Sequence, residues 1–318
     1  MFFNRVIGYV KGLFHGDSLI QHLDLFVEEQ RRLCSWTDGT VAVFTSLRGN
    51  LDEFRSSLLL GEVDNQLMLS FLDFLVAHGY NNTTIAKKLS LLKWFLRWCA
   101  GKGYYKGKAH QTFSPRLKGG NYEDKEVVFL TEDELKRLED YPFEPGSSYD
   151  RVRDLFVFSC YSGLRFSDVT ALTHNDLHDG ALHVVTKKTG TAVVIHINSH
   201  TERIIAKYAD NDDGRLLPMM VSQVVNRKLK EIGRIVGINT PVKLVRHNGS
   251  RTAVDYSPKH EVLSFHVARR TFVTMAVRKG IPSQVIMSWT GHRSERMLRP
   301  YLAVVDSVKE ESMKKFDD

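Results

Sequence analysis

Apolar residues recur at three- and four-residue intervals through the first third of the chain, which is the spacing of amphipathic helices. This spacing predicts four helices, over residues 18–33, 38–54, 65–79 and 82–103. The last helix has one continuous apolar face, made of Ile85, Leu89, Leu92, Leu96 and Cys99. Its other faces carry Lys87, Lys93 and Arg97. We expect a small helical bundle with a basic exterior, although a solvated surface is the simpler interpretation of any single lysine.

A change of composition separates this bundle from the rest of the chain. Residues 114–126, "SPRLKGGNYEDKE", combine a proline, a glycine pair and mixed charges with few apolar residues, which is typical of a linker. Shortly afterwards, Thr131 and Glu134 have the spacing of a capping box, so a helix should begin there. The sequence thus predicts an N-terminal tail over 1–18, a helical domain over 19–113, a linker over 114–126 and a second domain over 127–318.

The second domain contains one segment with a different period. In "ALHVVTKKTGTAVVIHI", β-branched residues alternate on both sides of a short turn that contains glycine, which predicts a β-hairpin. Lys187 and Lys188 should lie at its exposed tip. The segments over 154–172 and 264–280 return to helical spacing. We therefore expect a mainly α fold with one small β-sheet (α+β).

Composition and charge narrow the class of partner. The chain has 318 residues with a net charge of +7 and an isoelectric point near 9.2, which favours a polyanion such as nucleic acid. Its three cysteines are odd in number and far apart, which argues against a disulfide framework. No run approaches the roughly 20 apolar residues of a membrane span, so no membrane association is expected. Because HExxH and CxxC patterns are absent, we expect no metal site.

Two stretches offer polar side chains suited to an anion. His266 and Arg269 are three residues apart on one face of a predicted helix, although a lone helical histidine is more often structural. Arg165 stands in an apolar run, where an unpaired charge is costly, so it should be paired or directed at an anion. The simpler alternative for Arg165 is a helix-surface pair with Asp168, worth about 0.3–0.5 kcal/mol.

A tyrosine near the C-terminus is surrounded by positive charge. Tyr301 follows the Gly291–His292 pair and lies close in sequence to three arginines, Arg293, Arg296 and Arg299. A tyrosine of the core needs apolar neighbours and one hydrogen-bond partner, whereas a tyrosine beside a phosphate needs cations. Pro300, with its preset φ, can begin a short helix that carries Tyr301.

The order of these residues resembles the active-site series of the tyrosine recombinases, the phage-integrase family, and especially integrases of bacterial mobile genetic elements. "SGLRFSDV" is similar to the family's T-G-[LM]-R-x-[SG]-E, "KKTGTAVVIHI" to its lysine hairpin and "HVARRTFVT" to its H-x-L-R-H-[TS]. The nine-residue step from His292 to Tyr301 is the family's usual interval. The helical region before the linker resembles its SAM-like core-binding domain. Ser162 and Asp168 depart from the commoner Thr and Glu.

The resemblance implies a site-specific recombinase or integrase whose catalytic residues are Arg165, Lys188, His266, Arg269, His292 and Tyr301. Tyr301 would attack a DNA phosphate and form a 3′-phosphotyrosyl intermediate. The two arginines and His292 would hold the phosphate, and His266 would manage the tyrosine proton. Lys188 would protonate the departing 5′-hydroxyl, with Asp168 supporting the site. No cofactor is implied, neither ATP nor metal.

The resemblance also implies partners. Double-stranded DNA should be bound by a homotetramer on two paired sites, with accessory or directionality proteins as further partners. Subunits would exchange the C-terminal tail, which presents Val304, Val308 and Met313. Expected contacts to DNA are Lys87, Lys88, Lys93, Arg97, Arg270 and Arg293. The expected location is the bacterial cytoplasm, on the nucleoid when DNA is bound. Two alternatives stay open, a type IB topoisomerase-like or telomere-resolving enzyme and a non-catalytic DNA-binding regulator.

Overall fold

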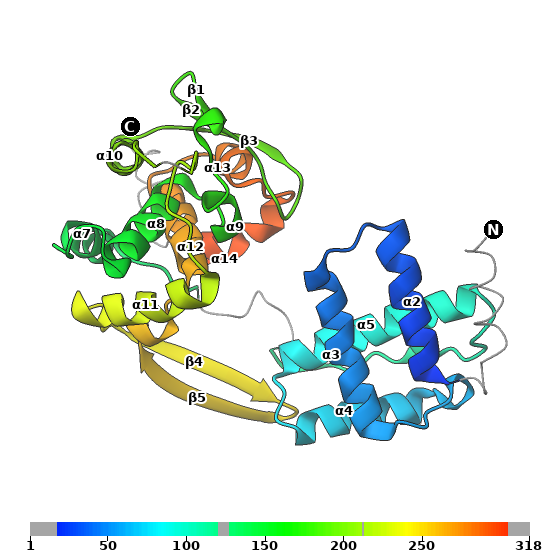
Figure 1. Ribbon diagram of the computed structural model, residues 1–318. Helices are drawn as coiled ribbons and strands as arrows, with labels where there is room; N and C mark the ends of the chain where they lie inside the picture. The colour runs from blue at the N-terminus through cyan, green and yellow to red at the C-terminus, as the bar shows by residue number, and fades with distance from the viewer. Residues whose placement is uncertain (1–17, 120–126, 212, 305–318) are drawn as a thin grey trace, which may run out of the picture. The chain divides into compact units, whose positions relative to one another are not determined.

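The computed structural model describes residues 18–119, 127–211 and 213–304 (Figure 1). The N-terminal tail, the second half of the predicted linker and the tail beyond residue 304 lie outside the described residues. Contacts divide the chain into two compact units. The first unit extends to Asp124 and also includes Val245–Ala253, whereas the second unit is made of the remaining residues from Lys125 onward.

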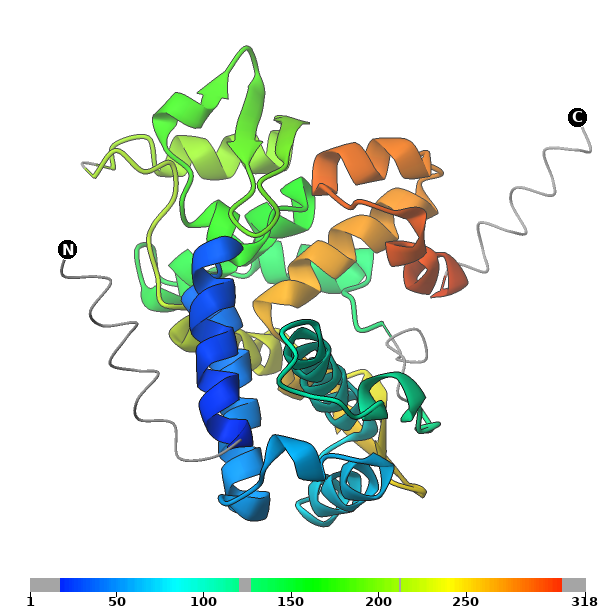
Figure 2. The ribbon, with the colours of Figure 1, turned by 90° about the vertical axis from the view of Figure 1, so that its right-hand side faces the viewer.

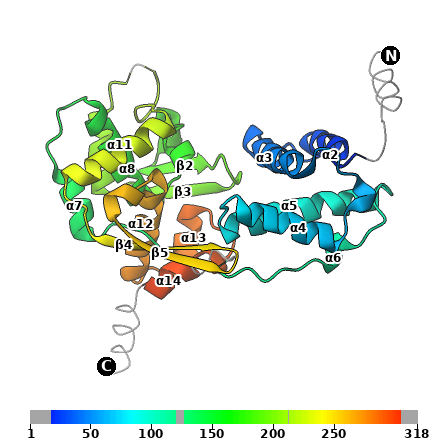
Figure 3. The same cartoon turned by 90° about the horizontal axis from the view of Figure 1, so that it is seen from below.

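The first unit is the predicted helical bundle, and all four expected helices are confirmed. Its helices are α2 (Leu19–Leu33), α3 (Asp38–Arg55), η1 (Leu60–Glu62), α4 (Asn65–Ala77), α5 (Asn82–Gly101) and α6 (Ala109–Thr112). Two of them begin at side-chain caps, because Thr37 accepts from the backbone of α3 and Asp64 accepts from that of α4. In Figure 3, α2 lies beside α3 and α4 lies beside α5.

The core of the bundle is aromatic and aliphatic. The predicted face of α5 is buried throughout, and it packs with the fully buried Phe26, Phe71 and Phe95. Lys88 requires a correction, because we expected its ammonium group to contact DNA. Its side chain is buried, and Nζ donates to Ser46 Oγ at 2.9 Å. Burial and the neighbouring Lys87 lower the pKa of Lys88, so this lysine belongs to the interior of the bundle.

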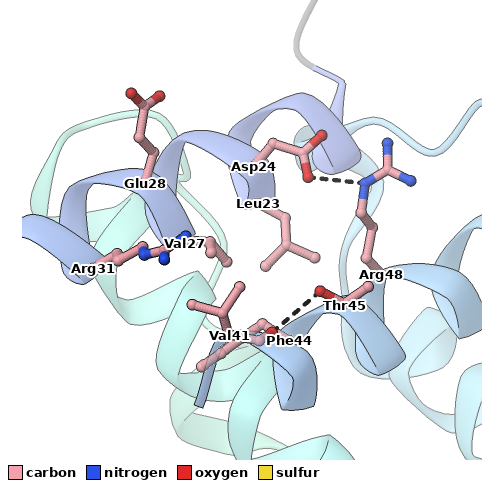
Figure 4. Close-up of a pocket in the computed structure, with 9 residues that line it drawn as sticks. All are labelled: Leu23, Asp24, Val27, Glu28, Arg31, Val41, Phe44, Thr45 and Arg48. Carbon is pink, nitrogen blue, oxygen red and sulfur yellow. Dashed lines mark hydrogen bonds and ion pairs between the residues drawn. The ribbon is translucent and has the colours of Figure 1, made fainter. Parts of the chain in front are cut away.

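A small pocket of about 230 Å³ opens between α2 and α3 (Figure 4). Leu23, Val27 and Phe44 give it an apolar lining, while Asp24 and Arg48 form an ion pair at its edge with a Nε–Oδ1 distance of 2.8 Å. None of the residues predicted to be catalytic lines this pocket. It is therefore a feature of bundle packing, separate from the predicted chemistry.

The second unit surrounds a central helix, α12 (Phe265–Arg278), which packs against α8 (Ser148–Ser162). The remaining helices are α7 (Glu132–Asp140), α9 (Phe166–Val169), η3 (His174–Asp176), α10 (Ser199–Lys207), α11 (Ser222–Ile235), η4 (Lys259–Val262), α13 (Ser283–Thr290), η5 (Glu295–Met297) and α14 (Arg299–Val304). The expected capping box opens α7, since Thr131 and Glu134 bond each other's backbone. Figure 2 shows α13 and α14 packed beside α12, in orange to red.

The predicted β-hairpin is confirmed and belongs to a three-stranded antiparallel sheet. Its strands are β1 (Leu177–His178), β2 (Ala181–Val185) and β3 (Ala192–His196), in the order β1-β2-β3. Leu182 pairs with Ile195 and Val185 with Ala192, so alternate side chains face the core. Lys187 and Lys188 lie in the exposed turn between β2 and β3, as expected.

A second sheet was not predicted. Strands β4 (Pro241–Asn248) and β5 (Arg251–Pro258) form a hairpin of their own. Its tip belongs to the first unit, where Asn248 Nδ2 donates to the carbonyl oxygens of Val76 and Tyr80 at 2.9 Å. Most of its side chains are exposed on both faces, so the sequence lacks the one-sided apolar pattern by which a strand is recognised.

Candidate active site

The turn after α8 places Arg165. Helix α8 ends at Gly163, which has a left-handed φ of 71°, and a Cβ atom there would lie 2.6 Å from the ring of Phe272. The chain then turns into the short helix α9, with Arg165 at its N-cap. Nη1 of Arg165 and Oδ2 of Asp168 are both buried without a hydrogen-bond partner among the described residues, so these two atoms do not pair with each other. The surface-pair interpretation of Arg165 is therefore excluded, and a buried guanidinium nitrogen is left available to an anion.

Arg269 is fixed by the main chain around it. Its side chain is buried, and Nη1 donates to the carbonyl oxygen of Gly163 at 2.7 Å. Nη2 donates to the carbonyl of Thr290 and lies 3.2 Å from Nε2 of His292. Burial and the charge of Arg165 lower the pKa of Arg269 to about 10, so the guanidinium stays charged at neutral pH. One residue of α12 thus ties the turn after α8 to the end of α13.

His292 is held in one tautomer by Thr290. The Thr290 hydroxyl donates to the carbonyl oxygen of Ile286 at 2.6 Å, so its oxygen accepts from Nδ1 of His292 at 2.9 Å. Nε2 then carries the lone pair that faces Arg269. Burial, followed by Arg269 and Arg165, lowers the pKa of His292 to about 3. The imidazole is therefore neutral at physiological pH.

His266 lies in the first turn of α12, among the same cations. Partial removal from water, followed by the charges of Arg270, Arg269, Arg165 and Lys188, lowers its pKa to about 4, although one side of the residue remains open to water. Arg165 and Lys188 therefore both contribute to the lowered pKa of this histidine. The structure therefore brings together residues that lie more than 100 positions apart in the sequence.

Tyr301 has both apolar neighbours and nearby cations, the two alternative environments considered from the sequence. Its ring packs against a small apolar cluster made of Val273, Ala276, Val277, Ile286 and Leu298. Burial raises the pKa of Tyr301, and the charges of Arg270 and Arg269 act in the opposite direction. Two arginines of α12 thus act on the hydroxyl of Tyr301. The short helix α14 carries Tyr301, as expected.

Asp168 connects α9 to the hairpin that carries Lys188. Its Oδ1 accepts from the backbone N–H of Lys187 at 2.9 Å, whereas its buried Oδ2 has no partner among the described residues. Sequence reasoning missed the parts of Thr290 and Arg270. Thr290 carries no recognisable motif of its own. The effect of Arg270 on Tyr301 depends on how α14 packs on α12, which the sequence does not reveal.

Comparisons with known proteins decide the family. Residues 128–307 match the phage integrase family, and residues 18–114 match the phage integrase SAM-like domain. The chain belongs to the phage integrase family. It is a tyrosine recombinase, an enzyme that breaks and rejoins DNA strands. Its sequence is 23% identical to the tyrosine recombinase XerC of Thermodesulfovibrio yellowstonii, over 73% of this chain and 75% of that protein.

Solved structures share the recombinase fold. The Tn1549 transposon integrase in complex with circular intermediate DNA aligns with a TM-score of 0.64 at 17% identity, covering 90% of this chain and 95% of that one. The XerH site-specific recombinase, in a post-cleavage complex with its palindromic difH substrate, aligns with a TM-score of 0.65 at 15% identity, covering 94% and 85%. The fold class expected from the sequence, a SAM-like helical domain followed by a mostly helical catalytic domain, is confirmed.

The other predicted contacts of this recombinase lie in varied surroundings. Lys87 and Arg97 are exposed on α5, but Nζ of Lys93 donates to the carbonyl oxygen of Phe113 at 2.8 Å. Arg293 is exposed, and its Nη2 donates to the carbonyl oxygen of Thr189 at 2.9 Å. Among the described residues, no group of three or more His, Cys, Asp or Glu side chains could hold a metal ion. No helix within the described ranges is long and apolar enough to span a bilayer.

Proposed function

We propose that this recombinase cleaves and rejoins double-stranded DNA at specific sites through a 3′-phosphotyrosyl intermediate on Tyr301. The observation that carries the proposal is the buried, unpartnered Nη1 of Arg165 within a cluster that includes Arg269, His292 and His266. A buried cationic donor without a partner is costly in the free protein and is satisfied by a bound anion. The complexes of the Tn1549 integrase and XerH with DNA support a DNA phosphate as that anion.

The environment of each residue suggests its role. Free tyrosine has a pKa near about 10 and is a weak nucleophile, so the hydroxyl of Tyr301 must lose its proton as it attacks phosphorus. Arg165 and Arg269 would stabilise the charge that develops on the non-bridging oxygens. His266, neutral and partly open to water, can accept the tyrosine proton. His292 would hydrogen-bond the phosphate. The negative charge of the phosphate would raise the pKa of His292, against the effect of the nearby guanidinium groups.

The leaving oxygen needs a proton, and Lys188 would supply it. Its side chain is exposed at the tip of the β2–β3 hairpin, and no hydrogen bond or ion pair within the described residues engages its ammonium group. The energy of the phosphodiester is kept in the bond to Tyr301, so the cycle needs neither ATP nor a metal ion. A 5′-hydroxyl from a partner strand then attacks this bond and releases the tyrosine.

We further propose a homotetramer on two paired DNA sites, in a bacterial cytoplasm. The bacterial XerC relative supports a bacterial origin of the chain, and the net charge of +7 supports DNA as the partner. Of the residues named for the predicted tail exchange, Val304 ends α14, whereas Val308 and Met313 lie outside the described ranges. Lys87 and Arg97 are the exposed basic residues of α5 best suited to contact DNA phosphates.

A covalent-trapping assay tests the proposal. The protein is mixed, in EDTA, with labelled nicked duplexes tiled from the DNA that flanks its gene, and adducts are resolved on a denaturing gel. We expect one or a few duplexes to give an adduct with the wild type and none with Tyr301→Phe. Clear binding without any adduct would favour the non-catalytic regulator. An adduct accompanied by relaxation of plasmids that lack the site would favour the topoisomerase-like alternative.

A further inference from the structure

The loop that carries Lys188 is fixed on both sides of that residue. On one side, Oδ1 of Asp168 accepts from the backbone N–H of Lys187 at 2.9 Å. On the other side, Nη2 of Arg293 donates to the carbonyl oxygen of Thr189, also at 2.9 Å. These two hydrogen bonds, called the tethers below, hold main-chain atoms of the residues before and after Lys188. They leave the side chain of Lys188 free to reach a substrate.

The loop is also braced from within. Thr186 Oγ1 lies 2.7 Å from Thr189 Oγ1 and donates to the carbonyl oxygen of Thr191 at 3.1 Å. The backbone N–H of Gly190 donates to the carbonyl oxygen of Thr186 at 2.8 Å. Because these bonds fix the shape of the loop, the two tethers determine how the loop is oriented toward the rest of the site.

The turn that contains Arg293 adjoins the loop closely. A Cβ atom on Gly291 would lie 3.5 Å from Val193 and 3.7 Å from Thr191, so α13 ends directly against the hairpin. Gly291 has a φ of 64°, which turns the chain toward His292 and Arg293. This turn therefore holds His292, assigned to the phosphate, next to an arginine that holds the loop of Lys188.

We propose that Arg293 is a positioning residue that places Lys188 for protonation of the leaving 5′-oxygen. The inference rests on the proposed function and gives Arg293 a role that differs from the phosphate contact expected from its charge. A guanidinium suits the task, because its planar fork of donors holds a carbonyl in a defined direction. Through this bond, the turn that presents His292 also sets the position of the general acid.

The chemistry of the leaving group distinguishes the two possible roles of Arg293, which are positioning of Lys188 and direct contact with a phosphate. During cleavage the bond from Tyr301 Oη to phosphorus forms and the bond from phosphorus to O5′ breaks. The 5′-oxygen departs with the electron pair and takes a proton from Lys188. If sulfur replaces this bridging oxygen, it leaves as a thiolate and needs no proton, since thiols have a pKa near about 8.5. A defect in Lys188 or in its placement should therefore disappear with sulfur, whereas a defect in phosphate binding should remain.

The experiment compares cleavage rates on the duplex trapped by the wild type, with oxygen or sulfur at the bridging 5′ position. We expect Arg293→Gln to slow cleavage of the oxygen substrate about 10- to 100-fold, because general acid catalysis contributes about 10²–10⁴-fold. On the sulfur substrate its rate should return to within about threefold of the wild type, the pattern also expected of Lys188→Ala. Arg293→Lys should show a smaller defect with the same rescue. Arg278→Gln removes the same charge from the exposed end of α12 and should behave as the wild type.

Two results would overturn the inference while leaving the proposed function intact. Arg293→Gln could be slow on both substrates, which would assign Arg293 to the phosphate or to DNA affinity. It could also match the wild type on both, which would remove any role in cleavage. Failure of the wild type to form any adduct would instead overturn the proposed function, and the inference with it.

Discussion

Arg165 and Arg269 illustrate how differently two arginines of one site can be used. The two terminal nitrogens of Arg269, Nη1 and Nη2, are engaged by carbonyl groups and by His292, so this side chain holds the site together before any substrate arrives. Arg165 keeps a buried nitrogen unpaired, at a cost of about 1–3 kcal/mol that a bound phosphate would recover. The sequence identified both residues by their spacing and context. It could not assign these separate tasks, because they depend on which carbonyls the folded chain brings near.

The neutral state of His292 predicts a pH dependence of stability. Its pKa is about 3 in the folded protein and near about 6.5 in the unfolded chain, so the unfolded chain binds more protons between these values. The stabilisation is complete above pH 6.5 and is lost progressively as the pH falls toward 3. Between pH 7 and pH 5 we expect His292 to account for about 1–2 kcal/mol of the loss.

Urea unfolding at the two pH values measures this contribution. The free energy of unfolding of His292→Gln should fall less between pH 7 and pH 5 than that of the wild type, by the same 1–2 kcal/mol. Equal losses in the two proteins would show that the folded-state pKa of His292 is close to its ordinary value.

At the scale of elements, a helix or strand could be predicted from the sequence where one of its faces is buried. Helix α5 and the β2–β3 hairpin each bury one face, so their periods of 3.6 and 2 could be recognised. The β4–β5 hairpin is exposed on both faces, and its tip is held by polar contacts with residues about 170 positions away. Such contacts leave no periodic pattern, so neither the second sheet nor its place in the first unit could be foreseen.

Besides Asn248, the buried Asn82 also holds the tip of this hairpin. It is fully buried, its Nδ2 donates to the carbonyl oxygens of Gly249 and Lys118, and its Oδ1 accepts from the N–H of Gly249. Asn82→Ala should lower the free energy of unfolding by about 2–4 kcal/mol, because it removes three partly buried hydrogen bonds that each contribute about 0.5–1.5 kcal/mol. Limited trypsin digestion should then cut the released tip at Arg246 or Arg251 before global unfolding.

A matched control is the neighbouring Asn81→Ala. Asn81 is exposed and its side chain makes no capping bond, so stability should change by less than about 0.5 kcal/mol. If Asn82→Ala is as stable and as resistant to trypsin as Asn81→Ala, the hydrogen bonds of Asn82 do not anchor the hairpin.

At the scale of the whole molecule, the chain combines a catalytic unit with a helical unit that is not continuous in sequence. Val245–Ala253 reach the first unit from the middle of the second, so the two units are joined by the chain at three points. The family assignment gives DNA recombination as the activity, and the positive net charge of the chain favours a negatively charged partner. Assembly depends on surfaces between subunits, which the periodicity of a single chain does not encode.

Deletion of residues 305–318 tests the proposed assembly. If the tail is exchanged between subunits, the shortened protein should still form the covalent adduct on one site but lose the tetramer on paired sites. Mass photometry on one-site and two-site DNA, together with a recombination assay, measures both properties. Unchanged recombination, or a wild type that stays monomeric on paired sites, would contradict tail exchange.

The identity of the bond between protein and DNA tests the central claim most directly. The trapped adduct is digested with nuclease and protease, and the peptide that retains a nucleotide is sequenced by tandem mass spectrometry. We predict a nucleotide attached through its 3′-phosphate to Tyr301, with the 5′-labelled side of the cut strand retained by the protein. A nucleotide on any other residue, or attachment through a 5′-phosphate, would contradict the account.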